Sequence, residues 1–298
     1  MGRLMMDRRT FLAAGALALA GCRPGRRGLA VASKNFTEQL ILGELLAQYL
    51  EKPTIPVDRR FYMAGTYICH QALLANRIDM YVEYTGTALT AVLKEKPFSD
   101  SAQVLAKVKD EYQKRFGLEV MPPLGFDNSF AMVMRGDLAR TGVRKLSELA
   151  AIAPQLRMGV GYEFLERPDG FKGLAATYDL HFAEPPRVMD LGLLYRALQS
   201  RQVDVVAGSN TDGLIAALGL VVLEDDRHYF PPYEAVPIVH PACFAKYPGV
   251  HDALLHLAGK ISAEDMRRVN YAVDGEKKDA SAVVREYLAS KNWFEPCG

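Results

Sequence analysis

The stretch that decides the expected fold is Ile78-Asp79-Met80-Tyr81-Val82-Glu83-Tyr84-Thr85-Gly86-Thr87. Its first five residues predict a short, largely apolar strand, and the polar cluster 83–87 leads directly into a helix. In open α/β sheets, ligands bind at the carboxyl ends of strands, beside the N-termini of the following helices. The cluster therefore predicts part of a ligand-binding site.

The same strand, cluster and helix arrangement occurs at two other places. Residues 29–33 predict a strand that ends at Ser33-Lys34-Asn35, and residues 203–207 predict one that leads to the cluster 209–213. Asn35, with Glu38 three residues later, is typical of a capping box at a helix start. Other short strands are expected at 55–61, 127–134, 157–161, 187–188, 220–223 and 235–239. Strands that alternate with helices predict an α/β architecture with largely parallel sheets, and two such sheets would form two lobes.

Residues 1–22 predict an export signal. Arg8-Arg9 precedes an apolar run, and Leu19-Ala20-Gly21-Cys22 resembles a bacterial lipobox, in which cleavage leaves Cys22 as a lipid-bearing N-terminus. Residues 23–28 then form a short tether. An ordinary secretory signal is the alternative, and both the twin-arginine and the general secretory route stay open. We expect a lipid-anchored protein in the periplasm or on the outer face of the cytoplasmic membrane.

The composition argues against several classes of function. With 36 Lys and Arg against 35 Asp and Glu, the net charge of +1 argues against a nucleic-acid partner. The four cysteines have no metal-site spacing, and nothing local supports a Cys69–Cys243 disulfide, although the compartment allows one. The sequence contains no Gly-x-Ser-x-Gly, His-Glu-x-x-His or phosphate-binding loop. We expect a monomer that is not an enzyme and uses no cofactor or metal.

Four segments, in this order, resemble the substrate-binding proteins of osmoprotectant importers of the ABC class, which capture glycine betaine, choline, carnitine and related compounds. They are Ser-Lys-Asn-Phe-Thr-Glu-Gln at 33–39, Glu-Tyr-Thr-Gly-Thr at 83–87, Thr-Asp-Gly at 211–213 and Phe-Pro-Pro-Tyr-Glu-Ala-Val-Pro at 230–237. The likeness extends over residues 29–296.

The resemblance implies a type II periplasmic-binding-protein fold, in which two α/β lobes are joined by two crossover strands and the ligand lies in the cleft between them. The first lobe would comprise residues 29–128 and 234–298, and the second residues 129–233. An ABC permease and its ATPase subunits would be the partners, and a small zwitterion the ligand.

The resemblance also implies two ends of the binding site. A trimethylammonium group cannot donate hydrogen bonds and binds aromatic faces by cation–π attraction, whereas a carboxylate takes cations and hydroxyl donors. The positions that match the cationic end are Tyr84, Phe130, Ser209 and Tyr233, and those that match the carboxylate end are Lys34, Thr87 and Arg167. Candidate polar contacts are Asn35, Gln39, Asn128 and Asp212.

Ser209 departs from the family pattern. Members with a complete aromatic cage carry a ring at this position, so one wall is missing here unless Tyr162 or Tyr229 replaces it. Phe130 replaces a family tyrosine and keeps the ring. The ligand expected is a carboxylate-bearing quaternary ammonium, either glycine betaine bound weakly or a bulkier betaine, with choline the poorer ligand. A bulkier or non-quaternary zwitterion (ergothioneine-like or an amino acid) and a sensory role instead of import stay open.

Overall fold

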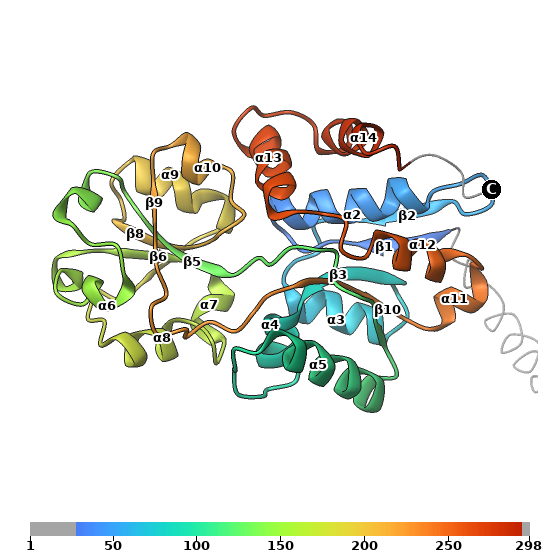
Figure 1. Ribbon diagram of the computed structural model, residues 1–298, viewed down its shortest axis with the longest axis horizontal. Helices are drawn as coiled ribbons and strands as arrows, with labels where there is room; N and C mark the ends of the chain where they lie inside the picture. Colours follow the sequence, from blue (N-terminus) through green and yellow to red (C-terminus); the bar gives the residue numbers. More distant parts are fainter. Residues whose placement is uncertain (1–27, 294–298) are drawn as a thin grey trace, which may run out of the picture.

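The computed structural model describes residues 28–293, which form two α/β lobes that lie side by side (Figure 1). Each lobe is built on its own five-stranded sheet, and two extended segments pass between the lobes near the middle of the molecule. Among these residues, no helix combines the length and apolar composition that a membrane span requires. The expected signal at 1–22, with Cys22, and Cys297 lie outside the described residues.

The first lobe contains the sheet with strand order β2-β1-β3-β10-β4. Its strands are β1 (Leu29–Ala32), β2 (Val57–Arg60), β3 (Met80–Tyr84), β4 (Glu119–Val120) and β10 (Ala235–Val239). Its helices are α2 (Thr37–Leu50), α3 (Thr66–Leu74), α4 (Thr85–Thr87) with the π-helical turn Ala88–Val92, α5 (Ser101–Phe116), α11 (Ala242–Lys246), α12 (Val250–Leu257), α13 (Ala263–Asp274) and α14 (Ala280–Ser290).

The second lobe contains the sheet with strand order β7-β6-β8-β5-β9. Its strands are β5 (Phe130–Met134), β6 (Met158–Val160), β7 (Arg187–Val188), β8 (Val205–Ser209) and β9 (Val221–Leu223). Its helices are α6 (Leu146–Leu149), α7 (Tyr162–Glu166), α8 (Phe171–Tyr178), α9 (Leu194–Gln199) and α10 (Leu214–Ala217), with short 3-10 turns at Leu138–Thr141, Ala153–Gln155 and Leu191–Leu193.

The central strands are apolar because helices cover both faces of each sheet. In β1, Leu29 and Val31 pack in a core cluster with α2, whereas Ala30 and Ala32 pack in a second cluster with α3 and α5. All four side chains are at most 1% exposed. A strand that is buried on both faces shows a continuous apolar run instead of alternation.

The prediction of largely parallel sheets is wrong, because both sheets are mixed. β5 runs antiparallel to β8 and β9, and β10 runs antiparallel to β3 and β4, whereas β1, β2 and β3 are parallel, as are β6, β7 and β8. The reason lies in the connections between the lobes. β5 and β10 start at the crossing segments, next to the cleft, whereas their neighbours β8 and β3 end there.

The two crossing segments pair with each other. Asp127 and Glu234 form an antiparallel bridge, and the backbone N–H of Asn128 donates to the carbonyl of Tyr233 at 2.9 Å. The carboxylate of Asp127 accepts the backbone N–H of Tyr233 at 2.5 Å. The expected lobe boundaries, 128/129 and 233/234, fall inside this paired region, so both crossings are held at one place.

Cys69 and Cys243 are both buried thiols and do not form a disulfide with each other. Cys69 lies in the core cluster under α3 and α5, and Cys243 lies in the cluster under α2 and α12. Burial raises the pKa of the Cys69 thiol to about 12. Both cysteines therefore act as small core residues.

Candidate ligand-binding cleft

Tyr84 and Glu38 meet where β3 ends beside α2. The Tyr84 hydroxyl donates to Oε1 of Glu38 at 2.6 Å. The side-chain amides of Asn128 and Asn270 also donate to Glu38, the latter to Oε2 at 2.9 Å. Glu38 is 4% exposed, and this burial raises its pKa although the hydrogen bonds act in the opposite direction. This corner of the cleft thus contains a carboxyl group that receives only uncharged donors.

Lys34 follows β1 and is buried against Glu83. Its Nζ lies 2.5 Å from Oε1 of Glu83 and 3.3 Å from the hydroxyl of Thr66. The same nitrogen lies 4.7 Å from the centre of the Tyr84 ring, within cation–π range. An ammonium group has three hydrogens, and these contacts use two of them. Lys34 is therefore charge-balanced by Glu83 and retains one hydrogen-bond donor.

Arg167 follows α7 and connects the second lobe to the first. Its Nε and Nη2 bind the carboxylate of Asp169 at 2.8 and 2.5 Å, and its Nη1 donates to the hydroxyl of Thr87 at 2.9 Å. Asp169 is fully buried and also accepts the hydroxyl of Tyr233 at 2.5 Å. Burial opposes both charges, but the ion pair dominates: the pKa of Arg167 lies above its usual value and that of Asp169 below. Both groups are therefore charged.

A cluster of aromatic rings surrounds Phe130, the first residue of β5. The ring centres of Phe164, Tyr233 and Phe230 lie 4.9, 5.3 and 5.5 Å from that of Phe130. The guanidinium carbon of Arg167 lies 5.1 Å from the Phe130 ring centre and 5.7 Å from that of Tyr233. The rings expected at the cationic end of the site thus contact the arginine expected at its carboxylate end.

Ser209 ends β8 and begins a polar turn. Its backbone N–H donates to Oδ2 of Asp212 at 2.9 Å, and its hydroxyl lies 3.0 Å from that of Thr211. Asp212 also accepts the hydroxyl of Tyr195, and burial raises the pKa of Asp212 to about 7. The side-chain oxygen of Asn210 is buried without a hydrogen-bond partner among the described residues. The turn therefore carries small polar groups at Ser209, Asn210 and Thr211.

The two lobes touch each other on several sides of this site. Asn270, on α13 of the first lobe, donates to the carbonyl of Thr211 at 3.0 Å as well as to Glu38. A Cβ on Gly65, at the start of α3, would lie 1.9 Å from a carboxylate oxygen of Glu163, on α7. Together with the Arg167–Thr87 hydrogen bond, these contacts bring residues of both lobes to one place.

The residues expected to make polar contacts with the ligand differ in their burial and in their hydrogen-bond partners. Gln39 is 1% exposed, and neither atom of its side-chain amide has a hydrogen-bond partner within the described chain. Asn128 binds Glu38, as described above. Asn35 is half-buried, and its backbone N–H donates to the carbonyl of Ala64 at 3.1 Å.

The predicted capping box at Asn35 is wrong. α2 begins at Thr37, is preceded by Phe36 in an extended conformation, and has no side-chain cap. The carboxylate of Glu38, which the box required, is instead bound by Tyr84 and two asparagines that are distant in sequence. Three tertiary donors thus outweigh one local hydrogen bond.

Two of the three rings that surround Phe130 come from residues that sequence reasoning missed, whereas the third, Tyr233, was expected. Tyr162 is 68% exposed, and the Tyr229 hydroxyl donates to the carbonyls of Pro168 and Gly170. Phe164 and Phe230 supply the rings instead. Phe230 lies in the recognised segment 230–237 and Phe164 lies three residues before Arg167, but no periodic signal distinguishes a ring of the binding site from a core ring. Glu38, Asp169 and Asn270 were also missed, because no local pattern distinguishes a polar residue of the binding site from one elsewhere.

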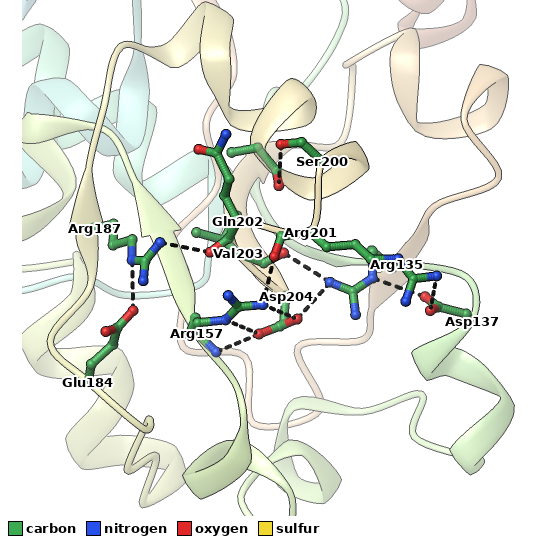
Figure 2. A network of polar contacts seen from close by, with 11 residues as sticks. Arg135, Asp137, Arg157, Glu184, Arg187, Ser200, Arg201, Gln202, Val203 and Asp204 are labelled. Atoms are coloured by element: carbon green, nitrogen blue, oxygen red, sulfur yellow. Dashed lines mark hydrogen bonds and ion pairs between the residues drawn. The ribbon is translucent and has the colours of Figure 1, made fainter.

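A second polar network lies in the second lobe, at the turn between α9 and β8 (Figure 2). Asp204 binds Arg135 at 2.6 Å and Arg157 at 2.9 Å. These arginines and Arg187 also donate to backbone carbonyls of residues 201–203. A cavity of about 410 Å³ lies nearby, between residues 135–140 and 218–220. None of the site residues expected from the sequence belongs to this network.

Two lobes on separate mixed sheets, joined by paired crossings, with residues of both lobes meeting at one site, define a type II periplasmic substrate-binding protein. The comparisons give the family. Residues 28–290 match the family model OpuAC, the substrate-binding domain of ABC-type glycine betaine transport systems. The chain belongs to this family and is an extracytoplasmic substrate-binding protein of an ABC importer, a transport class and not an enzyme class.

Two curated relatives illustrate the range of the family. The chain is 34% identical over 265 residues to the carnitine transport binding protein OpuCC of Listeria monocytogenes, with 87% of this chain and 85% of the relative covered. It is 36% identical over 262 residues to the ergothioneine transport permease/ergothioneine binding protein EgtU of Helicobacter pylori, of which the alignment covers 47%. The two names give different ligands, carnitine and ergothioneine, so membership of the family does not decide which ligand this protein binds.

A solved structure supports the fold. The crystal structure of a glycine betaine/carnitine/choline ABC transporter protein superposes with a TM-score of 0.74 at 30% identity, covering 90% of this chain and all of that one.

Proposed function

We propose that this protein captures a betaine-type zwitterion, with a trimethylammonium group and a carboxylate, and delivers it to an ABC permease with its ATPase subunits. The observation that carries the proposal is the position of Arg167. It contacts Thr87, Asp169 and the rings of Phe130 and Tyr233, so donors for a carboxylate and faces for a quaternary ammonium lie within one ligand length.

The cationic end of the ligand would bind the faces of Tyr84, Phe130 and Tyr233. Each ring contributes about 0.5–2 kcal/mol of cation–π attraction in a desolvated site. The carboxylate would bind Thr87 and the remaining N–H groups of Lys34 and Arg167. Because Glu83 and Asp169 already balance these two cations, the cleft has no large excess of positive charge, which suits a zwitterion better than a simple anion.

A bulkier zwitterion is the second candidate, and the turn at Ser209 favours it. The side-chain oxygen of Asn210 and the amide of Gln39 are buried without partners among residues 28–293. Buried polar atoms normally have hydrogen bonds, so these atoms are available to polar groups of a ligand. Carnitine and ergothioneine, named for the two relatives above, carry such groups beyond the trimethylammonium and carboxylate.

The cellular setting belongs to the same proposal. Lipidation at Cys22 would anchor the protein, as a monomer without enzymatic activity, to the outer face of the cytoplasmic membrane. Mass spectrometry of protein extracted from membranes would detect the lipid, and Cys22→Ala should move the protein to the soluble fraction. A sensory binding protein would use the same clamp, so loss of ligand uptake on gene deletion distinguishes import from sensing.

Calorimetric titration of the purified protein with glycine betaine, carnitine, choline, ergothioneine and proline tests the ligand class. Binding of at least one carboxylated quaternary ammonium, with choline weaker, is the expected result. If a bulky betaine binds more tightly than glycine betaine, the second candidate is favoured over the first. Binding of proline alone, or of none of the five, would overturn the proposal and leave the family unchanged.

A further inference from the structure

Glu38, like Asp212, is a buried acid near the candidate site that no cation balances among the described residues, and Glu38 is the one of the two that accepts the hydroxyl of Tyr84. Glu83 pairs with Lys34, and Asp169 pairs with Arg167. Glu44, also on α2 and also 4% exposed, pairs with Arg59 at 3.1 Å. Among the described residues, Glu38 has no ion-pair partner.

The neighbours of Glu38 increase the negative charge instead of neutralising it. Its direct partners are all uncharged: the Tyr84 phenol, the amides of Asn128 and Asn270, and the Thr211 hydroxyl. Asp212, whose carboxyl group is buried nearby, experiences the charge of Glu38 and of Asp274. Burying a charge without a counter-ion is costly, and the donors around Glu38 use both of its carboxylate oxygens. The chain therefore keeps an acidic group in contact with Tyr84 although burial disfavours its ionised form.

We propose that Glu38 is a specificity-determining residue, whose buried carboxylate selects a positively charged ligand head by acting through the hydroxyl of Tyr84. This inference rests on the proposed function, because it requires a quaternary ammonium on the Tyr84 ring. The carboxylate supplies the negative charge that the first lobe otherwise lacks at the cationic end.

Two effects carry the selection. A phenol that donates to a carboxylate at 2.6 Å is polarised, and charge shifts toward the ring face that attracts the cation. The carboxylate charge also attracts the cation directly across a site of low dielectric constant. Tyr233 has the matching hydrogen bond to Asp169, but there Arg167 cancels the charge. The Lys34 ammonium, 4.7 Å from the Tyr84 ring centre, is itself balanced by Glu83, so the charge of Glu38 next to Tyr84 is not cancelled.

The first test compares ligands that differ only in charge. Glycine betaine and 3,3-dimethylbutanoate have the same shape, but a neutral carbon replaces the nitrogen in the second. We expect Glu38→Gln to weaken glycine betaine binding about tenfold and 3,3-dimethylbutanoate binding less than about twofold. Glu44→Gln is the matched control, and should leave the ratio of the two affinities unchanged. Equal losses for both ligands in Glu38→Gln would overturn the inference.

The second test is a double-mutant cycle for glycine betaine alone, which serves even if 3,3-dimethylbutanoate binds too weakly to measure. Tyr84→Phe keeps the ring and removes the hydroxyl. If Glu38 acts through that hydroxyl, the double variant should lose no more affinity than the weaker-binding single variant. Fully additive losses would contradict the route through Tyr84.

Thermal unfolding without ligand separates selection from folding. Glu38→Gln removes an unbalanced buried charge but places an NH2 group opposite one buried donor, so the two effects offset each other and we expect a melting temperature within about 5 °C of the wild type. A large drop would assign Glu38 a structural role and overturn the inference. Failure of the wild-type protein to bind any betaine would overturn the proposed function as well, whereas wild-type binding that Glu38→Gln leaves intact would overturn this inference alone.

Discussion

The cleft and the arginine network of the second lobe show two uses of buried charge. Around Asp204, two arginines bind both carboxylate oxygens and also donate to carbonyls of residues 201–203. Around Arg167 and Glu38, charges are deeply buried, and several neighbouring polar atoms, such as both amide atoms of Gln39, have no hydrogen-bond partner in the described part of the chain. A fully satisfied network fixes a turn, whereas an incompletely satisfied one can bind a ligand.

The sharpest test of this comparison is Arg167→Met. The substitution leaves Asp169 buried without its cation, and it removes the contacts to Thr87, Phe130 and Tyr233. Breaking a buried pair in this way costs about 3–5 kcal/mol. We expect the free energy of unfolding to fall by this amount and betaine binding to become undetectable by calorimetry.

Arg157→Met is the matched change in the other region. Asp204 keeps Arg135, so ligand affinity should stay unchanged. Loss of binding in this variant would mean that the two regions are coupled.

Asp212 gives the cleft a pH dependence opposite in sign to that of Asp204 in the distal network, where burial acts to raise the pKa but the two arginines lower it. Burial raises the pKa of Asp212 from 3.8 to about 7, so between these values the folded state binds more protons than the unfolded state. The free energy of unfolding should therefore fall as pH rises from about 4 to about 7, by at most about 4 kcal/mol.

Urea unfolding of wild type and Asp212→Asn at several pH values checks this prediction. The variant should show a flatter profile over the same range. A wild-type profile that rises through this window in the same way as the variant profile would contradict it.

Asp204→Asn tests the structural side of the comparison. The amide cannot accept charge-assisted hydrogen bonds from both arginines, so we expect a loss of about 1–3 kcal/mol in the free energy of unfolding. Betaine affinity at a temperature where the variant is folded should be unchanged. A changed affinity would show that the α9–β8 turn acts on the site.

Ser209→Tyr has the smallest expected effect, and it tests the aromatic cage proposed for the cleft. A ring at this position would add one wall of the cage, worth about 0.5–2 kcal/mol for a trimethylammonium group. Glycine betaine affinity should rise by about two- to thirtyfold, and affinity for a bulkier betaine should fall. Parallel titration with both ligands measures the change. If both affinities fall, the added ring does not fit beside Thr211 and Asp212.

The positions of the strands were predictable from the local sequence pattern. Their directions were not, because these depend on the route that the chain takes between the lobes. The prediction of a strand at 235–239 is confirmed residue for residue by β10, because an apolar run bounded by Pro231-Pro232 is unambiguous. Its direction was not predictable. The antiparallel position of β10 against β3 depends on where the chain returns from the second lobe.

Several residues of the candidate site were also predictable from local motifs, whereas their contacts with distant residues were not. Lys34, Tyr84, Thr87 and Arg167 lie in recognisable motifs, and the structure brings the last two within 2.9 Å. Glu38 also lies in such a motif, but its local interpretation as part of a capping box was wrong. Its partners Tyr84, Asn128 and Asn270 are 46, 90 and 232 residues away. No local pattern encodes such a cluster.

By itself, the sequence determined the α/β class, the family and most of the residues at the lobe junction, because turn chemistry, apolar runs and motif order are local properties of the chain. Only the tertiary structure decided the direction of the crossing strands, the pairing of Lys34 and Arg167 with buried acids, and the unbalanced charge of Glu38. These depend on which distant groups meet in space, and burial then makes each charge strong or costly according to the partner that it finds.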